Sequence, residues 1–188
     1  MEIEKLLMKV TKILERLNIS YLITGGIAVT VWGRPRATFD IDIVIELFNS
    51  QIPFLINALK KLPKAGYVDE DAARSALEQK GEFNFIDLQS RLKVDFWIKK
   101  DNLFSKNEFK RKILKKIGGR KIYFISPEDL ILEKLLWYKE SESTRHLEDI
   151  ESILKISKVD LRYIRKWAER QNTIKILKKI LKQIEEER

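Results

Sequence analysis

The sequence contains no cysteine, few glycines and prolines, and no long hydrophobic segment. The absence of cysteine excludes disulfide bonds and thiolate metal sites, and it suits a reducing compartment. The longest uncharged apolar run, residues 21–33, is shorter than the roughly 20 residues that cross a bilayer. The N-terminal stretch MEIEKLLMKV is charged from its second position, unlike a secretory signal. We therefore expect a soluble, cytoplasmic protein without membrane contacts.

Acidic residues are also in short supply, because 28 Asp and Glu stand against 37 Lys and Arg, giving a formal net charge of +9. Between Lys99 and Lys121, ten basic residues are accompanied only by Asp101 and Glu108. A basic field of this kind attracts polyanions such as RNA or nucleoside triphosphates. The alternative is a solvated lysine-rich surface of the sort found in proteins from hot environments. Charge alone leaves both interpretations open.

Hydrophobic periodicity predicts a mixed α/β chain with a helical C-terminal region. Apolar residues at helical spacing predict helices at 2–17, 27–32, 51–62, 69–80, 127–140, 144–156, 160–170 and 173–186. Strand-like segments occur at 21–23, 38–47, 83–88, 92–98 and 121–125, with hairpin turns at 89–91 and 118–119. We expect an α/β (α+β) core with a mixed sheet and flanking helices over residues 1–125, and a helical region over residues 126–188 that packs on it.

The strand at 38–47 carries two acids, Asp40 and Asp42, within an otherwise apolar sequence. Strand side chains alternate between faces, so both carboxylates lie on one face, with Cα atoms about 6–7 Å apart. Paired acids repel each other unless a cation, a proton or water relieves them. Mg²⁺ prefers carboxylate oxygens, so the pair indicates a site for a hard metal ion. The alternative is an exposed edge strand whose charges prevent aggregation.

Two further elements complete a candidate site. Asp95 lies on the polar face of the strand at 92–98, so three acids on neighbouring strands are suited to holding two Mg²⁺ ions. Gly25 and Gly26 form a turn that opens a helix, where backbone N–H groups approach a phosphate closely, and Thr24 adds a hydroxyl donor. Each element has a plainer interpretation: a simple turn, a surface acid, or Asp87 in place of Asp95.

The order of these motifs resembles the nucleotidyltransferase superfamily that includes DNA polymerase beta. The resemblance is carried by TGGIA at 24–28, RATFDID at 36–42 and Val94-Asp95. The segments ISPEDLILEKLL at 125–136 and HLEDI at 146–150 are similar to the AbiEii-type branch of bacterial and archaeal nucleotidyltransferases, which are often toxins paired with an antitoxin. The resemblance covers about residues 21–155. Ile27 departs from it, because polymerase-like members have serine at that position.

The resemblance implies transfer of a nucleoside monophosphate from an NTP to an acceptor hydroxyl, with release of pyrophosphate. It implies that Asp40 and Asp42 bind both Mg²⁺ ions, for which Mn²⁺ substitutes, and that Asp95 binds the second ion and helps to deprotonate the acceptor. Gly25 and Gly26 would contact the triphosphate, and Lys134 would neutralise its charge. The expected partners are an NTP, an RNA (such as tRNA) or protein acceptor, and a cognate antitoxin.

Several cations remain ambiguous on the sequence alone. Lys134 shares a helix face with apolar residues, which favours a nearby anion, although a lysine that reaches out to water explains it equally well. Arg34 and Arg36 precede the acid strand and are candidates for phosphate or acceptor binding, or for solvent-exposed turn positions. Arg145 and Asp149 have the spacing of a local ion pair, and His146 beside them is expected at the surface.

Three functions fit these observations. The first is a Mg²⁺-dependent nucleotidyltransferase acting on RNA or protein. The second is a nucleotide- or RNA-binding module that has kept the fold and lost turnover. The third is a small-molecule nucleotidyltransferase, for example one acting on aminoglycosides, although a cationic drug requires an acidic cleft and this chain is strongly basic.

Overall fold

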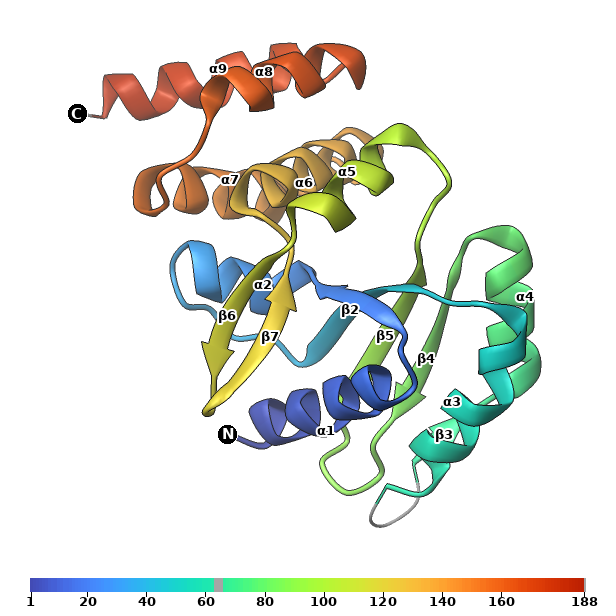
Figure 1. The fold of residues 1–188 in the computed structure, drawn as a ribbon. Helices are drawn as coiled ribbons and strands as arrows, with labels where there is room; N and C mark the ends of the chain where they lie inside the picture. Colours follow the sequence, from blue (N-terminus) through green and yellow to red (C-terminus); the bar gives the residue numbers. More distant parts are fainter. Residues whose placement is uncertain (63–65, 188) are drawn as a thin grey trace. The chain divides into compact units, whose positions relative to one another are not determined.

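The computed structural model describes residues 1–62 and 66–187 (Figure 1). The chain divides into two compact units, one made of Met1–Ile27 and Ala37–Ile125, the other of Ala28–Arg36 and Ser126–Arg188. The helix α2 (Gly25–Trp32) begins in the first unit and ends in the second. The domain boundary expected at residues 125 and 126 stays a prediction.

The first unit is built on a mixed sheet of seven strands among the described residues, in the order β3-β4-β5-β2-β1-β7-β6. The strands are β1 (Ser20–Ile23), β2 (Asp40–Glu46), β3 (Tyr67–Val68), β4 (Glu82–Ile86), β5 (Lys93–Ile98), β6 (Ile113–Ile117) and β7 (Arg120–Phe124). β2 runs parallel to β5 and antiparallel to β1. The acid-bearing strand is therefore central, and the edge-strand alternative for it is wrong.

The core lies on one face of this sheet because apolar residues alternate with polar ones along β2 and β5. Ile41, Ile43 and Ile45 of β2 and Val94 and Phe96 of β5 are completely buried. Three helices, α1 (Glu2–Arg16), α3 (Ile52–Lys60) and α4 (Glu70–Gln79), pack next to one another, with α3 in contact with both α1 and α4. α1 also packs against β1, and α4 packs against β4 and β5. A short 3-10 helix, Asn49–Gln51, precedes α3. The alternation that the sequence shows thus leaves the acids on the face opposite the core.

The periodicity in the sequence did not indicate two short elements of this unit, β3 and the helix α5 (Leu103–Arg111). The buried residues of α5 include Ser105 and Glu108, so the helix lacks the apolar stripe by which an amphipathic helix is identified. The strand β6 fills the incoming side of the expected hairpin, and its Gly118-Gly119 turn has positive φ at both glycines.

The second unit contains the helices α6 (Pro127–Ser141), α7 (Thr144–Ile156), α8 (Leu161–Arg170) and α9 (Ile174–Glu186). Ser126 caps α6, because its Oγ accepts a hydrogen bond from the Asp129 N–H at 3.1 Å. The buried Asp129 also accepts a hydrogen bond from the Tyr163 hydroxyl at 2.6 Å, which ties α6 to α8. No helix in the described part of the chain is long and apolar enough to cross a membrane.

Candidate active site

The three predicted acids lie on one face of the sheet in the first unit. Asp42 is directly opposite Asp95 in the parallel register of β2 and β5. Paired parallel strands lie about 4.8 Å apart, so these two carboxylates are neighbours. Asp40 is two residues before Asp42 and shares its face, opposite Lys93. The side chain of Asp95 is buried, with 7% of the residue exposed, while Asp40 and Asp42 are half-buried.

A lysine side chain already supplies positive charge to this group of acids. The Lys93 Nζ lies 2.9 Å from Oδ2 of Asp95. The hydrogen bond to Asp95 raises the pKa of Lys93 above its ordinary value, against the opposing effect of burial, and the charges of Asp95, Asp40 and Glu82 add to the rise. The acidic face is thus a place where a cation is stabilised.

A fourth acid, Glu82, belongs to the same surface and was not identified from the sequence. It lies on β4 two residues before Asn84 and on the same face of the strand, and Asn84 is paired with Asp95. Its pKa is raised because partial burial disfavours the charged carboxylate and because Asp95 and Asp42 repel it, while Lys93 opposes the shift. The signal was available in the alternation of EFNFI, but the predicted strand began one residue later, at Phe83.

The glycine turn is packed against the acid strand. Gly25 has φ of +61°, and a Cβ placed on it would lie 1.8 Å from Oδ2 of Asp42. The backbone N–H of the buried Thr24 donates to the carbonyl oxygen of Asp42 at 3.0 Å. Gly26 follows as the second residue of α2. The structure therefore brings Thr24, Gly25 and Gly26 together with the acids at the start of a helix.

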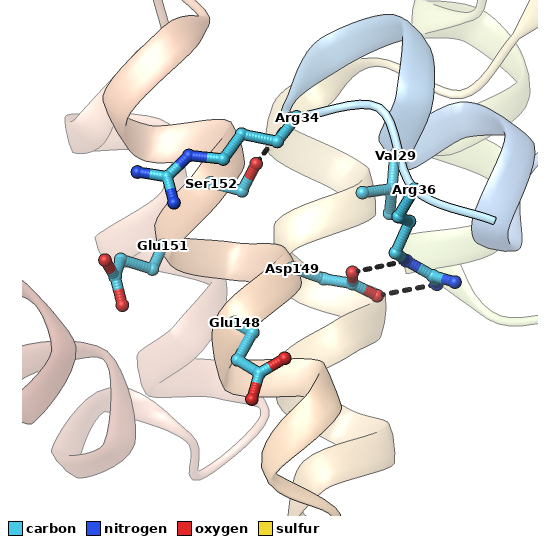
Figure 2. A pocket seen from close by; sticks show the side chains of 7 residues that line it. All are labelled: Val29, Arg34, Arg36, Glu148, Asp149, Glu151 and Ser152. Atoms are coloured by element: carbon cyan, nitrogen blue, oxygen red, sulfur yellow. Dashed lines mark hydrogen bonds and ion pairs between the residues drawn. The ribbon is translucent and has the colours of Figure 1, made fainter.

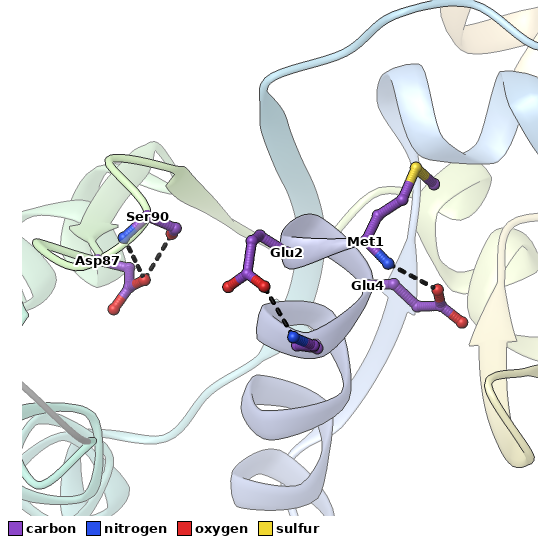
Figure 3. A network of polar contacts seen from close by, with 6 residues as sticks. Met1, Glu2, Glu4, Asp87 and Ser90 are labelled. Atoms are coloured by element: carbon purple, nitrogen blue, oxygen red, sulfur yellow. Dashed lines mark hydrogen bonds and ion pairs between the residues drawn. The ribbon is translucent and has the colours of Figure 1, made fainter.

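Asp87, the rival for the role of Asp95, is used in the β4–β5 turn instead. Its Oδ2 accepts hydrogen bonds from the backbone N–H of Ser90 at 3.0 Å and from the Ser90 hydroxyl at 2.5 Å (Figure 3). Side chains of Asp and Ser stabilise turns in this way. Asp87 therefore has a structural role in the hairpin connection.

The predicted phosphate ligands Arg36 and Lys134 belong to the second unit, where both pair with Asp149. The Arg36 Nε and Nη2 donate to the two oxygens of Asp149 at 2.8 and 3.0 Å, and the Lys134 Nζ lies 3.0 Å from Asp149 Oδ2. Lys134 and Asp149 are each 3% exposed. Burial alone would raise the pKa of Asp149, but the hydrogen bond from Arg36 and the charge of Lys134 hold it below its ordinary value.

This cluster corrects two expectations about the helix α7. The anion near Lys134 is Asp149, whose carboxylate pairs with Arg36 and Lys134 rather than with Arg145. His146 is half-buried rather than at the surface, and its ring lies edge-on to Trp137 with centroids 5.7 Å apart. Burial, followed by the charge of Lys134, lowers the pKa of His146. The two positive charges of Arg36 and Lys134 exceed the one negative charge of the Asp149 carboxylate between them.

A pocket of about 280 Å³ adjoins this cluster within the second unit (Figure 2). It is lined by Val29, Arg34, Arg36, Glu148, Asp149, Glu151 and Ser152. The backbone N–H of Arg34 donates to the Ser152 hydroxyl at 2.5 Å, which fixes the loop before Arg36 to α7. The predicted roles of Arg34, Arg36 and Lys134 toward a nucleotide stay predictions.

A family model described as "Nucleotidyltransferase of unknown function (DUF6036)" matches residues 1–184. The chain belongs to this nucleotidyltransferase family. The resemblance seen in the sequence motifs is thereby confirmed at the level of the superfamily. A comparison with curated proteins finds no match.

Solved structures similar to this nucleotidyltransferase include two antibiotic-modifying proteins. ANT(2'')-Ia in complex with adenylyl-2''-tobramycin is 16% identical with a TM-score of 0.63, and the match covers 92% of this chain and 98% of that chain. The lincosamide antibiotic adenylyltransferase LnuA, with lincomycin bound, is 17% identical with a TM-score of 0.56, and the match covers 84% of this chain and 98% of that chain. At these identities the comparisons establish the fold.

The acidic face of the nucleotidyltransferase fits a divalent metal by the chemistry of its donors. Asp40, Asp42 and Asp95 offer only carboxylate oxygens, which are the ligands that Mg²⁺ prefers. The ammonium group of Lys93 shows that a positive charge is stabilised beside Asp95. Among residues 1–62 and 66–187, however, no three His, Cys, Asp or Glu side chains are arranged as a ready metal-ligand cluster.

Proposed function

We propose that this chain transfers a nucleoside monophosphate from an NTP to an acceptor hydroxyl in a Mg²⁺-dependent reaction. The observation that carries the proposal is the register of Asp42 opposite Asp95, with Asp40 on the same face and the Gly25 turn against Asp42. Membership of a nucleotidyltransferase family supports the reaction class.

Two Mg²⁺ ions fit the proposed reaction, with Asp40 and Asp42 as ligands of both and Asp95 as a ligand of the second; Mn²⁺ is expected to substitute. Bound Mg²⁺ supplies charge neutralisation at the phosphates and a lower pKa at the acceptor hydroxyl. The ammonium group of Lys93 lies beside Oδ2 of Asp95, so it would compete with a metal ion for that oxygen.

The remaining work falls to groups of the chain itself. Backbone N–H groups of Gly25 and Gly26 donate to the triphosphate at the start of α2. The Asp95 carboxylate accepts the proton of the acceptor hydroxyl. The acceptor oxygen then bonds to the α-phosphorus as the bond from that phosphorus to the bridging oxygen breaks, and pyrophosphate leaves. The Thr24 hydroxyl is proposed as a further donor at this turn, and Arg36 and Lys134 are proposed as phosphate ligands in the second unit.

The test is release of pyrophosphate, and transfer of label, from each of the four labelled NTPs in the presence of Mg²⁺ and a mixture of RNA or protein acceptors. Asp95→Asn should lower the rate by roughly 10²–10⁴-fold, as loss of a proton-transfer group does. Asp42→Asn should also lower the rate strongly, because it removes a proposed ligand of both metal ions. Asp87→Asn is the matched control, because Asp87 serves the hairpin turn, and it should leave the rate nearly unchanged. Equal rates in Asp42→Asn and the wild type would overturn the proposal.

The charge of the chain bears on the chemical class of the acceptor. The net charge of +9 favours a polyanionic or macromolecular acceptor over a cationic drug. The similarity of the sequence to the AbiEii-type branch supports a toxin that pairs with an antitoxin. Growth arrest on expression, relieved by a neighbouring gene product and absent in Asp42→Asn, is the expected result for a toxin.

A second candidate is the same transfer to a small molecule. It is favoured by the match to ANT(2'')-Ia and LnuA over nearly the whole of both proteins. Transfer of labelled AMP to tobramycin or lincomycin, in preference to RNA or protein, would establish this candidate and displace the macromolecular acceptor. A non-catalytic module would instead show stabilisation by NTP without any release of pyrophosphate.

A further inference from the structure

The two-stranded ribbon formed by β6 and β7 carries a like-charged pair on its outer face. Lys116 is directly opposite Lys121 in the antiparallel register, and the next pair on the same face is Leu114 opposite Tyr123. Both lysines are exposed, and Leu114 is 46% exposed. Like charges opposite each other destabilise a sheet. Within the described residues neither lysine has an ion pair that relieves this repulsion.

The positive charge continues from the ribbon in a row that alternates with aromatic rings. The Lys112 Nζ lies 4.4 Å from the centroid of the Tyr123 ring and 5.5 Å from that of Phe109. Lys99 directly follows β5, and its Nζ lies 4.9 Å from the centroid of the Phe109 ring on α5. Lysines and rings therefore follow one another as Lys99, Phe109, Lys112 and Tyr123.

One cation of this row, Lys99, forms an ion pair with Glu46, whereas Lys112 contacts uncharged oxygens. The Lys112 Nζ bonds the hydroxyl of Ser20 at 2.8 Å and the carbonyl oxygen of Tyr21 at 3.4 Å, both uncharged groups. Its pKa is lowered by burial and by the charge of Lys99, against the attraction of Glu46.

The two acids of the segment do not offset this charge. Asp101 pairs with Lys80 at 3.1 Å, and Glu108 is 4% exposed. The exposed charge on this face, carried by Lys116 and Lys121, is therefore positive.

We propose that this surface, the basic ribbon face, binds single-stranded RNA. It consists of Phe109, Lys112, Leu114, Lys116, Lys121 and Tyr123. Lysines contact the phosphate backbone, whose binding releases counterions and relieves the repulsion between Lys116 and Lys121. The exposed leucine and the half-exposed tyrosine offer apolar surface to bases.

An unpaired strand fits this surface better than a duplex does. Bases reach apolar and aromatic side chains on an open sheet face only when they are unstacked, as in the loops and ends of RNA. A duplex would offer only its backbone and would leave Leu114 and Tyr123 without a partner. The inference concerns binding alone and does not depend on the proposed transfer reaction.

The experiment measures fluorescence anisotropy of a labelled single-stranded RNA of about 20 nucleotides of mixed sequence, without NTP and with metal removed by chelation. Lys116→Gln/Lys121→Gln is the test variant. Lys178→Gln/Lys179→Gln, two exposed lysines of α9, is the control with the same loss of net charge. Salt is varied from about 50 to about 200 mM, because phosphate contacts are read from the salt dependence.

The test variant should bind roughly tenfold more weakly, and the slope of log affinity against log salt should fall by about 1.4, or about 0.7 for each lost phosphate contact. Its melting temperature should not fall, since the substitution removes a like-charged pair, and this shows that the loss is not unfolding. The control should match the wild type. Equal weakening of both variants, or equally tight binding of duplex RNA, would overturn the inference.

Discussion

At the scale of single residues, Gly25 is the position on which the geometry of the acids depends most. Its φ of +61° lies in the left-handed region, which costs other residues about 1–2 kcal/mol. Its missing side chain also leaves the space that the Asp42 carboxylate occupies. One residue type satisfies both requirements, so the glycine sets the position of the turn relative to Asp42.

Gly25→Ala should therefore lower the free energy of unfolding by about 2 kcal/mol or more, which corresponds to about 4–8 °C in melting temperature. Two controls separate the causes. Gly119 has φ of +85° with open space around it, so Gly119→Ala should cost about 1–2 kcal/mol. Gly81 has open space and no positive φ, so Gly81→Ala should be nearly neutral. A Gly25 variant no less stable than the Gly119 variant would show that contact with Asp42 is unimportant.

The residues of the acidic face were predictable to different extents. Asp40, Asp42 and Asp95 followed from strand alternation, because side-chain direction in a strand depends only on sequence position. The pairing of Lys93 with Asp95 did not follow, since a long side chain can point to several neighbours. Glu82 was missed because the predicted strand began at Phe83. Its closeness to Asp95 also depends on the register of β4 against β5, which is set by the turn and the packing.

At the scale of elements, long apolar patterns predicted the helices and the central strands, whereas short or polar elements were not predicted. The helices α6 to α9 lie within about one or two residues of the predicted ranges, as is usual for helix ends. The start of α2 was missed because Gly25 and Gly26 were interpreted as a turn before the helix. A helix that buries serine and glutamate, such as α5, gives no periodic signal.

The Asp149 cluster joins three segments of the second unit: α6 through Lys134, α7 through Asp149 itself, and the loop through Arg36. Asp149→Asn leaves a buried lysine and a largely buried arginine without their carboxylate. Breaking a buried pair in this way costs about 3–5 kcal/mol. We therefore expect the variant to unfold at a clearly lower denaturant concentration near neutral pH.

The pH dependence of this loss follows from the lowered pKa of Asp149. A carboxyl whose pKa is lower in the folded state stabilises the fold above its ordinary value of 3.8, and this contribution disappears as pH falls through the folded pKa. The difference between wild type and Asp149→Asn should be full at about pH 5 and above, and should shrink below pH 3.8. Glu148→Gln, at the exposed neighbouring position, should differ from wild type by less than about 0.5 kcal/mol. A difference that is constant down to low pH would contradict the assignment.

At the scale of the whole molecule, the proposed reaction predicts that ligand binding stabilises the fold. A ligand that binds only the folded chain adds about 2.7 kcal/mol at a concentration a hundred times its Kd. For a chain of this length that corresponds to a rise of about 5–10 °C in melting temperature. The rise should require both NTP and Mg²⁺, should persist in Asp87→Asn, and should be much smaller in Asp42→Asn. An equal rise in Asp42→Asn would place the nucleotide elsewhere.

The sheet of the first unit also has a consequence for how the molecule behaves at high concentration. Its outermost strands are β3, which is only two residues long, and β6, which carries Lys115 and Lys116. Very short edge strands, and lysines on edge strands, keep unpaired peptide groups from forming hydrogen bonds with a strand of another molecule. A broad sheet can therefore end in open hydrogen-bonding groups at both sides and still resist growth into fibres.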